Sequence, residues 1–409
     1  MFSFSTILSM AKAVLTKNSP FYVQFYVSKH CNLRCRMCNI VEANADLAPF
    51  PGDRIEDIAR NLRRIGVGVV LLTGGEPFLR KDIDRIVQTF KAYNLDIRLQ
   101  TAGLYSQREK IKRCAELGVT DINVSLDSLD RSFSDSINGV EGSFDNAIRT
   151  IAYISRTFPA KGAICALGCV LSRYNLDHVR SVLEFATEIG WWLSLVPVHI
   201  TDADTPLNFR GQDALFSLPP DQHQYLEELI KDLKRLKRKG ALLFDSDDYL
   251  DSILHFVRTG SPNWRHQGIC DSPNLYFAIL PDGRFAPCCD HRLERVVHVY
   301  DPDFPALYAS GILHQEVRAI SRNCPGCNFG SFPEMTLSAR SPSTILERLR
   351  TQCKALRRSQ RPFEENELFA LLERIKARHP VYAAPLEHAR PEKLTPQPDS
   401  FRSGNGGEE

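Results

Sequence analysis

The chain has 409 residues, of which 43% are hydrophobic, and its 51 basic and 49 acidic residues leave a formal net charge of +2. The length favours one large domain with a smaller appendage, and the balanced charge gives no global attraction to nucleic acid or an anionic membrane. The chain contains no apolar run long enough to span a membrane, so we expect a cytoplasmic protein. Twelve cysteines in clustered spacings suit metal ligation better than a disulfide scaffold, which is typical of small secreted chains.

Residues 1–20 are predicted to form an amphipathic helix. Its apolar residues fall at helical spacing: Phe4, Ile7, Leu8, Ala11, Val14 and Leu15. The segment lacks the basic start and the cleavage site of a signal peptide. We expect this helix to dock on the domain, and a weak contact with a membrane surface is the alternative.

Residues 21–205 alternate short apolar runs with amphipathic helical stretches, which predicts six β-then-α units. The predicted strands cover residues 22–27, 67–72, 95–100, 121–125, 162–171 and 192–198. Such units form a parallel sheet with right-handed crossovers, and six of them predict an α/β fold with an open, partial (βα)6 TIM-like barrel. The active-site residues of these folds lie at the C-terminal ends of the strands.

The remainder of the chain is predicted to form four segments. They are a helical connector (206–265), a small cysteine-rich domain (266–332), C-terminal helices (333–384) and a disordered tail rich in Pro, Gly, Ser and Glu (385–409). Within the cysteine-rich domain, residues 276–280 and 284–286 flank Pro281-Asp282-Gly283 and predict a β-hairpin.

The loop after the first predicted strand carries Cys31-Asn-Leu-Arg-Cys35-Arg-Met-Cys38. Three thiolates on a tight loop can hold three irons of a cubane and leave the fourth iron open, whereas a closed cluster needs four ligands. The alternative is a zinc site, for which His30 could supply the fourth ligand.

Gly74-Gly75-Glu76-Pro77 follows the second predicted strand. Glycines at a strand end let the backbone approach a ligand closely, and a carboxylate beside them can accept from an ammonium group. A plain strand-to-helix turn is the alternative. The occurrence of this motif on the strand after the cysteine loop favours a ligand site.

With these two motifs, the chain resembles the radical S-adenosylmethionine (SAM) superfamily over roughly residues 21–200. The resemblance implies that SAM binds the open iron of a [4Fe–4S] cluster through its amino and carboxylate groups. Glu76 and the backbone of Gly74 and Gly75, with Pro77, would hold the methionine amine. The family often has an aromatic residue before the last cysteine, where this chain has Met37, a thioether that can still pack near the adenine.

Two further strand ends resemble the family's cofactor contacts. Similar enzymes carry Thr-Asn-Gly where this chain has Thr101-Ala102-Gly103, so Thr101 is the expected polar contact. Ser125-Leu-Asp127 matches another strand end, where Ser125 would approach the ribose or carboxylate of SAM. A turn or helix-capping role is an equal alternative for Asp127.

A second cysteine group resembles the shortened auxiliary-cluster domain, called twitch, of the SPASM family. Its four members are Cys270, Cys288, Cys324 and Cys327. Four thiolates allow a fully ligated second [4Fe–4S] cluster, and a structural zinc knot is the alternative. Cys289 could replace Cys288, but Cys288 has the better spacing from Gly283.

The resemblance implies an enzyme that reductively cleaves SAM to a 5′-deoxyadenosyl radical, which abstracts hydrogen from a small biosynthetic substrate. A fully ligated second cluster has no open iron and is better suited to accept an electron, so we expect a net oxidation and an oxidoreductase. The expected partners are the small-molecule substrate and a reductant such as flavodoxin or ferredoxin, and no nucleic acid. The alternatives are modification of a peptide or RNA, and a non-enzymatic iron–sulfur carrier, for which the motifs at Glu76 and Ser125 would have no purpose.

Overall fold

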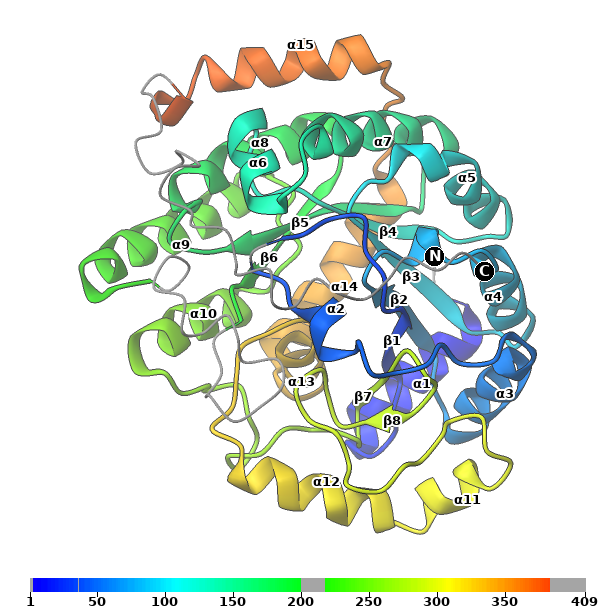
Figure 1. The fold of residues 1–409 in the computed structure, drawn as a ribbon. Helices are drawn as coiled ribbons and strands as arrows, with labels where there is room; N and C mark the ends of the chain where they lie inside the picture. Colours follow the sequence, from blue (N-terminus) through cyan, green and yellow to red (C-terminus); the bar gives the residue numbers. More distant parts are fainter. Residues whose placement is uncertain (1–2, 36, 200–217, 383–409) are drawn as a thin grey trace.

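The computed structural model describes residues 3–35, 37–199 and 218–382, and the tail predicted to be disordered lies outside these ranges. One sheet runs through the molecule in the order β6-β5-β4-β3-β2-β1-β7-β8 (Figure 1). Its strands are β1 (Tyr22–Ser28), β2 (Val69–Gly74), β3 (Asp96–Thr101), β4 (Asp121–Ser125), β5 (Ile164–Leu171), β6 (Trp192–Pro197), β7 (Tyr276–Ile279) and β8 (Phe285–Ala286). The first seven strands pair in parallel, and only β8 is antiparallel to its neighbour. The predicted α/β fold with an open parallel sheet is confirmed.

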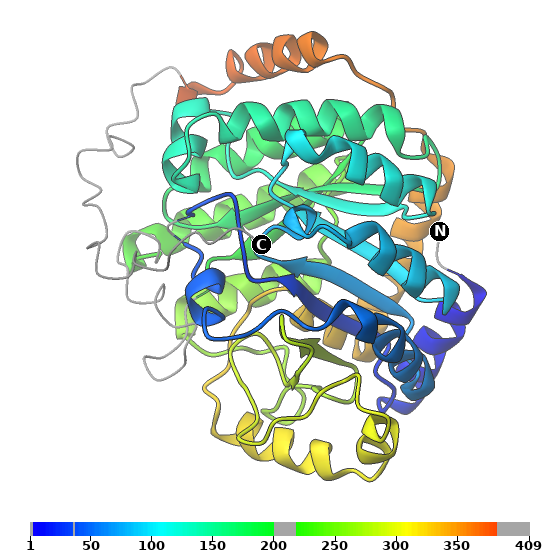
Figure 2. The same ribbon diagram turned by 45° about the vertical axis from the view of Figure 1, so that its right-hand side comes forward.

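Helices cover the outer face of the sheet (Figure 2). They are α1 (Phe4–Thr16), α2 (Ile40–Ala43), α3 (Ile55–Ile65), α4 (Ile83–Ala92), α5 (Arg108–Glu116), α6 (Arg131–Asn138), α7 (Ser143–Thr157), α8 (Val179–Ile189), α9 (His223–Arg238), α10 (Asp247–Thr259), α11 (Phe304–Ala309), α12 (Ile312–Asn323), α13 (Phe332–Arg340), α14 (Pro342–Arg357) and α15 (Glu365–Lys376). Among the described residues, no helix is long and apolar enough to cross a membrane.

Side-chain alternation along β1 separates the core from the interior of the barrel. Val23 and Phe25 belong to the main hydrophobic core under the helices. Gln24 and Tyr26 point the other way and line an internal cavity. Because successive side chains of a strand lie on opposite faces, one apolar run supplies both the core and the cavity wall.

The cysteine-rich region joins the barrel through its sheet. The predicted hairpin forms, with Ala278 of β7 paired to Ala286 of β8. Strand β7 also pairs in parallel with β1, with Tyr276 opposite Tyr22. Backbone hydrogen bonds therefore connect the second cysteine group directly to the strand that leads into the first one.

Helix α1 docks on the barrel as expected, but with the opposite face from the one its apolar stripe suggested. Its buried residues are Thr6, Ser9 and Ala13, and Thr6 Oγ1 donates to the carbonyl of Gly68 at 2.9 Å. The close approach of Thr6 to Gly68 leaves room only for small side chains on this face. Phe4, Ile7, Leu8 and Leu15 are exposed, whereas Met10 packs against the apolar cluster beneath the helix.

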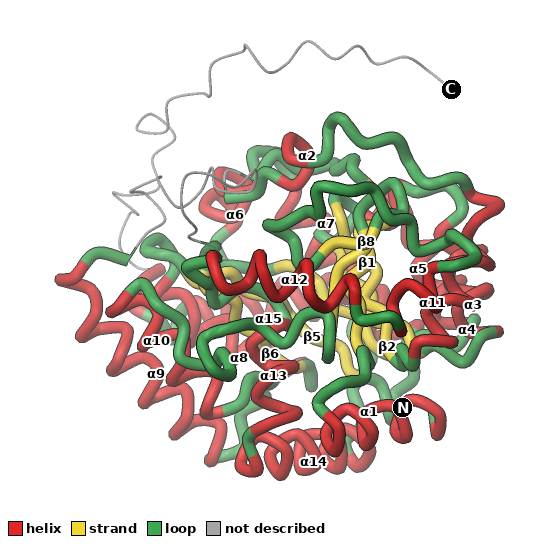
Figure 3. Tube along the Cα trace, turned by 90° about the horizontal axis from the view of Figure 1, so that it is seen from below, coloured by secondary structure: helices red, strands yellow, loops and turns green. Residues whose placement is uncertain are grey.

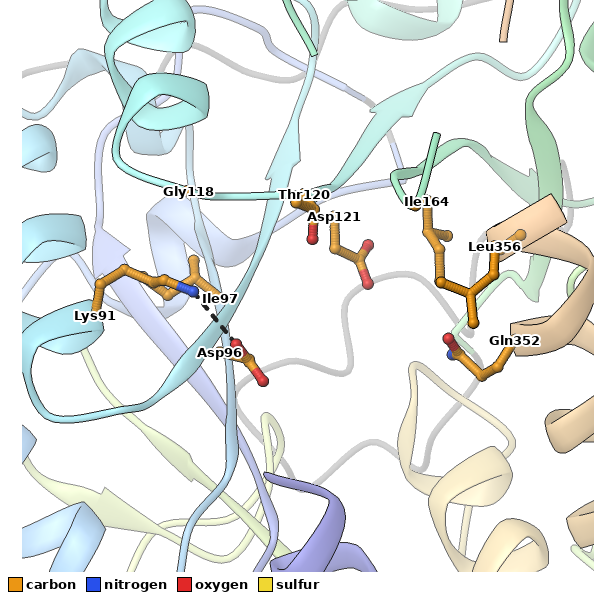
Figure 4. Close-up of a pocket in the computed structure, with 11 residues that line it drawn as sticks. Lys91, Asp96, Ile97, Gly118, Thr120, Asp121, Ile164, Gln352 and Leu356 are labelled. Carbon is orange, nitrogen blue, oxygen red and sulfur yellow. Dashed lines mark hydrogen bonds and ion pairs between the residues drawn. The ribbon is translucent and has the colours of Figure 1, made fainter. Parts of the chain in front are cut away.

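Helix α14 lies at the same end of the barrel as α1, and Figure 3 shows both at the end opposite α2. A small cavity of about 20 Å³ separates α14 from the beginnings of the strands. In Figure 4, Gln352 and Leu356 of α14 face this cavity across from Asp96 and Asp121, which begin β3 and β4.

Candidate functional site

A cavity of about 300 Å³ occupies the interior of the barrel and reaches the ends of its strands. Seven of the predicted site residues line it: Cys31, Cys35, Cys38, Gly74, Gly75, Thr101 and Ser125. They come from the ends of four different strands, β1 to β4, so the sheet brings together motifs that lie far apart in the sequence. Glu76 and Pro77 are buried behind this lining.

Helix α6 holds the cysteine loop in place. The backbone N–H of Arg34 donates to the carbonyl of Asn138 at 2.9 Å, and that of Cys38 donates to the carbonyl of Cys35 at 2.9 Å. A Cβ atom on Gly139 would lie 2.7 Å from the Arg34 carbonyl oxygen, so the glycine that ends α6 permits this contact.

The donor set of this loop suits an iron–sulfur cluster with one open iron. Cys31 and Cys35 are half-buried and Cys38 is exposed, and all three line the cavity. The side chain of His30, the fourth ligand that zinc would need, is exposed and is not part of the lining. Burial raises the pKa of the Cys31 thiol to about 11, while the donating N–H of Leu33 lowers it, so ligation must displace a proton.

Gly74 and Gly75 pack the end of β2 against the cysteine loop. The backbone N–H of Gly75 donates to the carbonyl of Ser28 at 2.8 Å, and that of Glu76 donates to the carbonyl of His30 at 2.7 Å. A Cβ atom on Gly75 would lie 2.1 Å from the His30 carbonyl oxygen, and one on Gly74 would lie 2.3 Å from that of Ser28. No other residue type fits at either position, because a real Cβ atom cannot approach a carbonyl oxygen this closely.

The Glu76 carboxylate connects the end of β2 to the end of β3. It is fully buried and accepts hydrogen bonds from Thr101 Oγ1 at 2.9 Å, Ala102 N at 2.8 Å and Phe78 N at 3.1 Å. Burial raises the pKa of Glu76 to about 7, and the three donors act in the opposite direction. The predicted contact with the amine of SAM stays a prediction, and the carboxylate already accepts from three donors within the protein.

Thr101, Ser125 and Asp127 mark the next strand ends. Thr101 is buried, donates to Glu76 and accepts from Gly103 N at 3.1 Å. Ser125 is half-buried at the end of β4 and lines the cavity. Asp127 accepts from the backbone N–H of Val170 at 2.7 Å, and burial raises its pKa to about 7. Asp127 therefore links the loop after β4 to β5.

Met37 belongs to an apolar cluster beside the cysteine loop. It is 8% exposed and packs with Phe133, Ile137 and Val198. Met37 and Val198 line the cavity beside the thiols and give it an apolar wall against which a planar ring could lie.

The four cysteines of the second group lie close enough to influence one another's ionisation. Burial raises the pKa of Cys270 to about 12, and the neighbouring Cys288 and Cys324 raise it further. Burial raises the pKa of Cys327, and the neighbouring Asp290, Cys270 and Cys288 raise it further. The loops that carry them are anchored by Cys270 N donating to Ser321 Oγ at 2.9 Å and by Trp264 Nε1 donating to the Cys327 carbonyl at 2.9 Å.

A buried pair, His199 and Asp290, stands between the cavity and this second group. His199 Nε2 lies 2.7 Å and 2.8 Å from the two Asp290 carboxylate oxygens, and both side chains line the cavity. Ligand atoms of His199, Asp290 and Cys327 lie within 4.8 Å of one another. Cys289 also lines the cavity, whereas Cys288 does not.

Sequence reasoning missed His199 and Asp290, although both carry a signal. His199 follows the sixth predicted strand, and Asp290 directly follows the cysteine pair. Two other polar residues of the interior, Asp245 and Tyr249, have no sequence motif beside them that would have predicted their position. Asp245 accepts from Leu195 N at 2.6 Å, and burial raises its pKa to about 6. The hydroxyl of Tyr249 is buried without a hydrogen-bond partner among the described residues.

Comparisons with known proteins agree with this arrangement. The model of the Radical SAM superfamily matches residues 25–186. A probable GTP 3′,8-cyclase of Pyrococcus horikoshii is 32% identical over 222 residues, which are 53% of this chain and 68% of that protein. The mycofactocin maturase MftC of Mycolicibacterium smegmatis is 25% identical over 66% of this chain and 64% of its own length.

A solved structure shares the fold. The crystal structure of Streptococcus suis SuiB bound to S-adenosylmethionine superposes with a TM-score of 0.57 and 18% identity, covering 76% of this chain and 70% of SuiB. The family match, the cyclase relative and the order of the motifs along the sheet lead to one conclusion. This chain belongs to the radical SAM superfamily, whose members use a [4Fe–4S] cluster and S-adenosylmethionine.

Proposed function

We propose that this protein is a radical SAM oxidoreductase that removes hydrogen from a small molecule in a biosynthetic pathway and passes the remaining electron to a second cluster. One observation carries the proposal. The three thiols of the cysteine loop line one cavity, and Cys327 of the second group lies next to His199 and Asp290, which line the same cavity. Oxidation of a substrate radical needs an acceptor for its electron, and a second cluster near the same cavity would supply one.

Cys31, Cys35 and Cys38 are the proposed ligands of the first cluster. With SAM bound, this cluster supplies reductive cleavage of SAM, and with it the capacity to break an unactivated C–H bond. The electron would come from a protein such as flavodoxin or ferredoxin. The exposed position of Cys38 keeps this site near the surface, where such a partner can approach.

The protein's own residues position SAM and exclude water. Gly74 and Gly75 present their backbone to the cavity, and Ser125 supplies a hydroxyl from the end of β4. Glu76 fixes Thr101 and Ala102 at the edge of the same space, so its contribution includes positioning. The apolar cluster around Met37 packs against Cys35 and shields that side of the loop from water.

The second cluster is proposed to accept the electron. Its ligands would be Cys270, Cys288, Cys324 and Cys327, which leave no iron open for substrate. The mutual influence of these thiols on their pKa values supports one shared site. Twitch-type domains of the SPASM family have this cysteine spacing, so we assign the region to that type.

A test of SAM cleavage separates the two sites. Anaerobically reduced wild-type protein should form 5′-deoxyadenosine from SAM, detected by liquid chromatography. A Cys35→Ala variant should form none, whereas Cys324→Ala/Cys327→Ala should retain cleavage because its first site is intact. Equal 5′-deoxyadenosine from wild type and Cys35→Ala would contradict the proposal. The non-enzymatic carrier reading predicts no 5′-deoxyadenosine from any of the three.

The second candidate is a peptide-modifying enzyme with the same radical chemistry, and the match to a maturase over 66% of this chain favours it. The two candidates differ in the origin of the abstracted hydrogen. Transfer of deuterium into 5′-deoxyadenosine from a labelled small molecule supports the first. Transfer only from a labelled peptide replaces it by the second.

A further inference from the structure

Helix α1 presents its large apolar side chains to the surface. Phe4 is 76% exposed and Leu15 is 83% exposed, and Ile7 and Leu8 are each more than half exposed. The face that docks on the barrel consists of Thr6, Ser9 and Ala13, with Met10 partly buried beside them. Several large apolar side chains exposed together on a protein surface indicate a site where another apolar surface binds.

Helix α14 shows the same arrangement. Leu346, Leu349 and Cys353 are exposed on one side of the helix, and Leu356 continues this stripe at the edge of the small cavity, with a spacing of three or four residues throughout. The three leucines are 48%, 59% and 46% exposed. The buried residues of this helix are Thr344, Thr351 and Ala355, all of them small.

Both stripes lie at one end of the molecule, where the strands begin. The backbone N–H of Ser3, at the start of α1, donates to Asp96 Oδ2 at 2.6 Å. Gln352 and Leu356 of α14 line the small cavity that also includes Asp96 (Figure 4). Figure 3 shows the two helices together at the end opposite α2. We call this end the basal surface, with the apolar members Phe4, Ile7, Leu8, Leu15, Leu346, Leu349 and Leu356.

The charges on these two helices are almost all positive. Lys12, Arg350 and Arg357 are exposed among the apolar residues. Helix α1 contains no acidic residue, and the one acid of α14, Glu347, forms an ion pair with Lys237. Asp96 and Asp121 at the adjoining strand starts are paired with Lys91 and Arg98.

We propose that the basal surface binds the surface of an anionic membrane, with α1 and α14 lying in the plane of the headgroups. Apolar side chains would enter the boundary of the acyl chains, and the basic residues would contact anionic headgroups. A symmetric contact with a second copy of the chain would place the same cations of both copies at one interface. Charge complementarity therefore favours an anionic lipid surface.

This orientation leaves the catalytic cavity accessible from the aqueous side. The cavity opens at the strand ends near α2, and the basal surface lies at the opposite end (Figure 3). The inference depends only on the two helices and not on the chemistry proposed for the cavity.

Co-sedimentation with vesicles tests the inference on the full chain. Wild type should bind vesicles that contain phosphatidylglycerol and bind vesicles of pure phosphatidylcholine much more weakly. Leu346→Ser/Leu349→Ser/Leu356→Ser should lower the partition coefficient at least about tenfold, because three apolar contacts are lost. Arg350→Glu/Arg357→Glu should lower it by about fivefold or more for each charge.

A matched control removes exposed apolar residues elsewhere. Val296 is 58% exposed and Ile312 is 45% exposed, both in the cysteine-rich half of the chain. Val296→Ser/Ile312→Ser should bind vesicles as wild type does, and circular dichroism should show all variants folded. Failure of wild type to bind anionic vesicles, or equal binding by the leucine variant, would overturn the inference. A wild-type dimer that the leucine variant converts to a monomer would also overturn it, in favour of a second copy.

Discussion

Glu76 shows what the sequence predicts about one residue and what it does not. Its motif identified a strand end at the cavity, and Gly74 and Gly75 do line that cavity. The partners of the carboxylate were not predictable, because Thr101 and Ala102 come from the next strand and meet Glu76 only in the folded sheet. A motif identifies which residue types stand at the end of a strand. The hydrogen-bond partners of a buried side chain depend on how separate strands and helices pack together.

Glu76→Ala should lower the free energy of unfolding by about 3 kcal/mol, because it leaves three buried donors without their acceptor. It should also weaken SAM binding about tenfold or more, since the edge of the cavity is no longer held. Thr101→Val is a milder change, because it removes only one of the three donors. It should lower the free energy of unfolding by about 1 kcal/mol. Urea titration and equilibrium dialysis measure the two effects. Unchanged stability of Glu76→Ala would mean that these hydrogen bonds contribute nothing net.

At the scale of elements, the strands follow from the apolar runs. All six predicted barrel strands form within two residues of their expected bounds. The faces of α1 and α14 do not follow from periodicity. Their apolar stripes satisfy the helical pattern, yet the barrel packs against the small residues on the other side.

The contact between β2 and the cysteine loop predicts a consequence for cluster assembly. Gly75→Ala should reduce the iron held by the first site by more than half, because the new methyl group collides with the His30 carbonyl and displaces the loop. Gly52→Ala is the matched control, since its Cβ would meet only the side chain of Asp82 at 3.2 Å. Iron assays after anaerobic reconstitution give the comparison, and equal iron in the two variants would contradict it.

The segment before α8 carries a pH-sensitive contact. His178 is buried beside Ser128, whose hydroxyl lies 2.7 Å from Nδ1, and burial lowers the His178 pKa from 6.5 to about 4. The unfolded chain therefore takes up a proton at a higher pH than the folded one. The contribution of His178 to stability is complete above about pH 6.5 and is lost as the pH falls toward 4, by about 3 kcal/mol.

His178→Asn should flatten this dependence, because asparagine does not titrate in that range. The free energy of unfolding, measured by urea titration from pH 4 to 7.5, should fall more steeply with acid in wild type than in the variant. Parallel curves for the two proteins would show that His178 does not titrate as its burial implies.

At the scale of the whole molecule, one sheet unites the two cysteine groups. The sequence predicted both groups and the hairpin within the second one, but not that β7 would extend the barrel sheet beside β1. That pairing joins residues more than 250 positions apart, and a short run such as 276–279 carries no mark of its neighbour. The contact between His199 and Asp290 was not predictable from the sequence for the same reason. It depends on how the cysteine-rich half of the chain packs against the end of β6.

The most direct test of two separate cluster sites is the iron content of reconstituted protein, combined with Mössbauer spectroscopy. Two [4Fe–4S] clusters predict about eight irons per chain in wild type. Cys31→Ala/Cys35→Ala/Cys38→Ala should keep about four irons, all in a cluster of the fully cysteine-ligated type. Zinc in place of iron at the second group, or loss of all iron from that variant, would contradict the account.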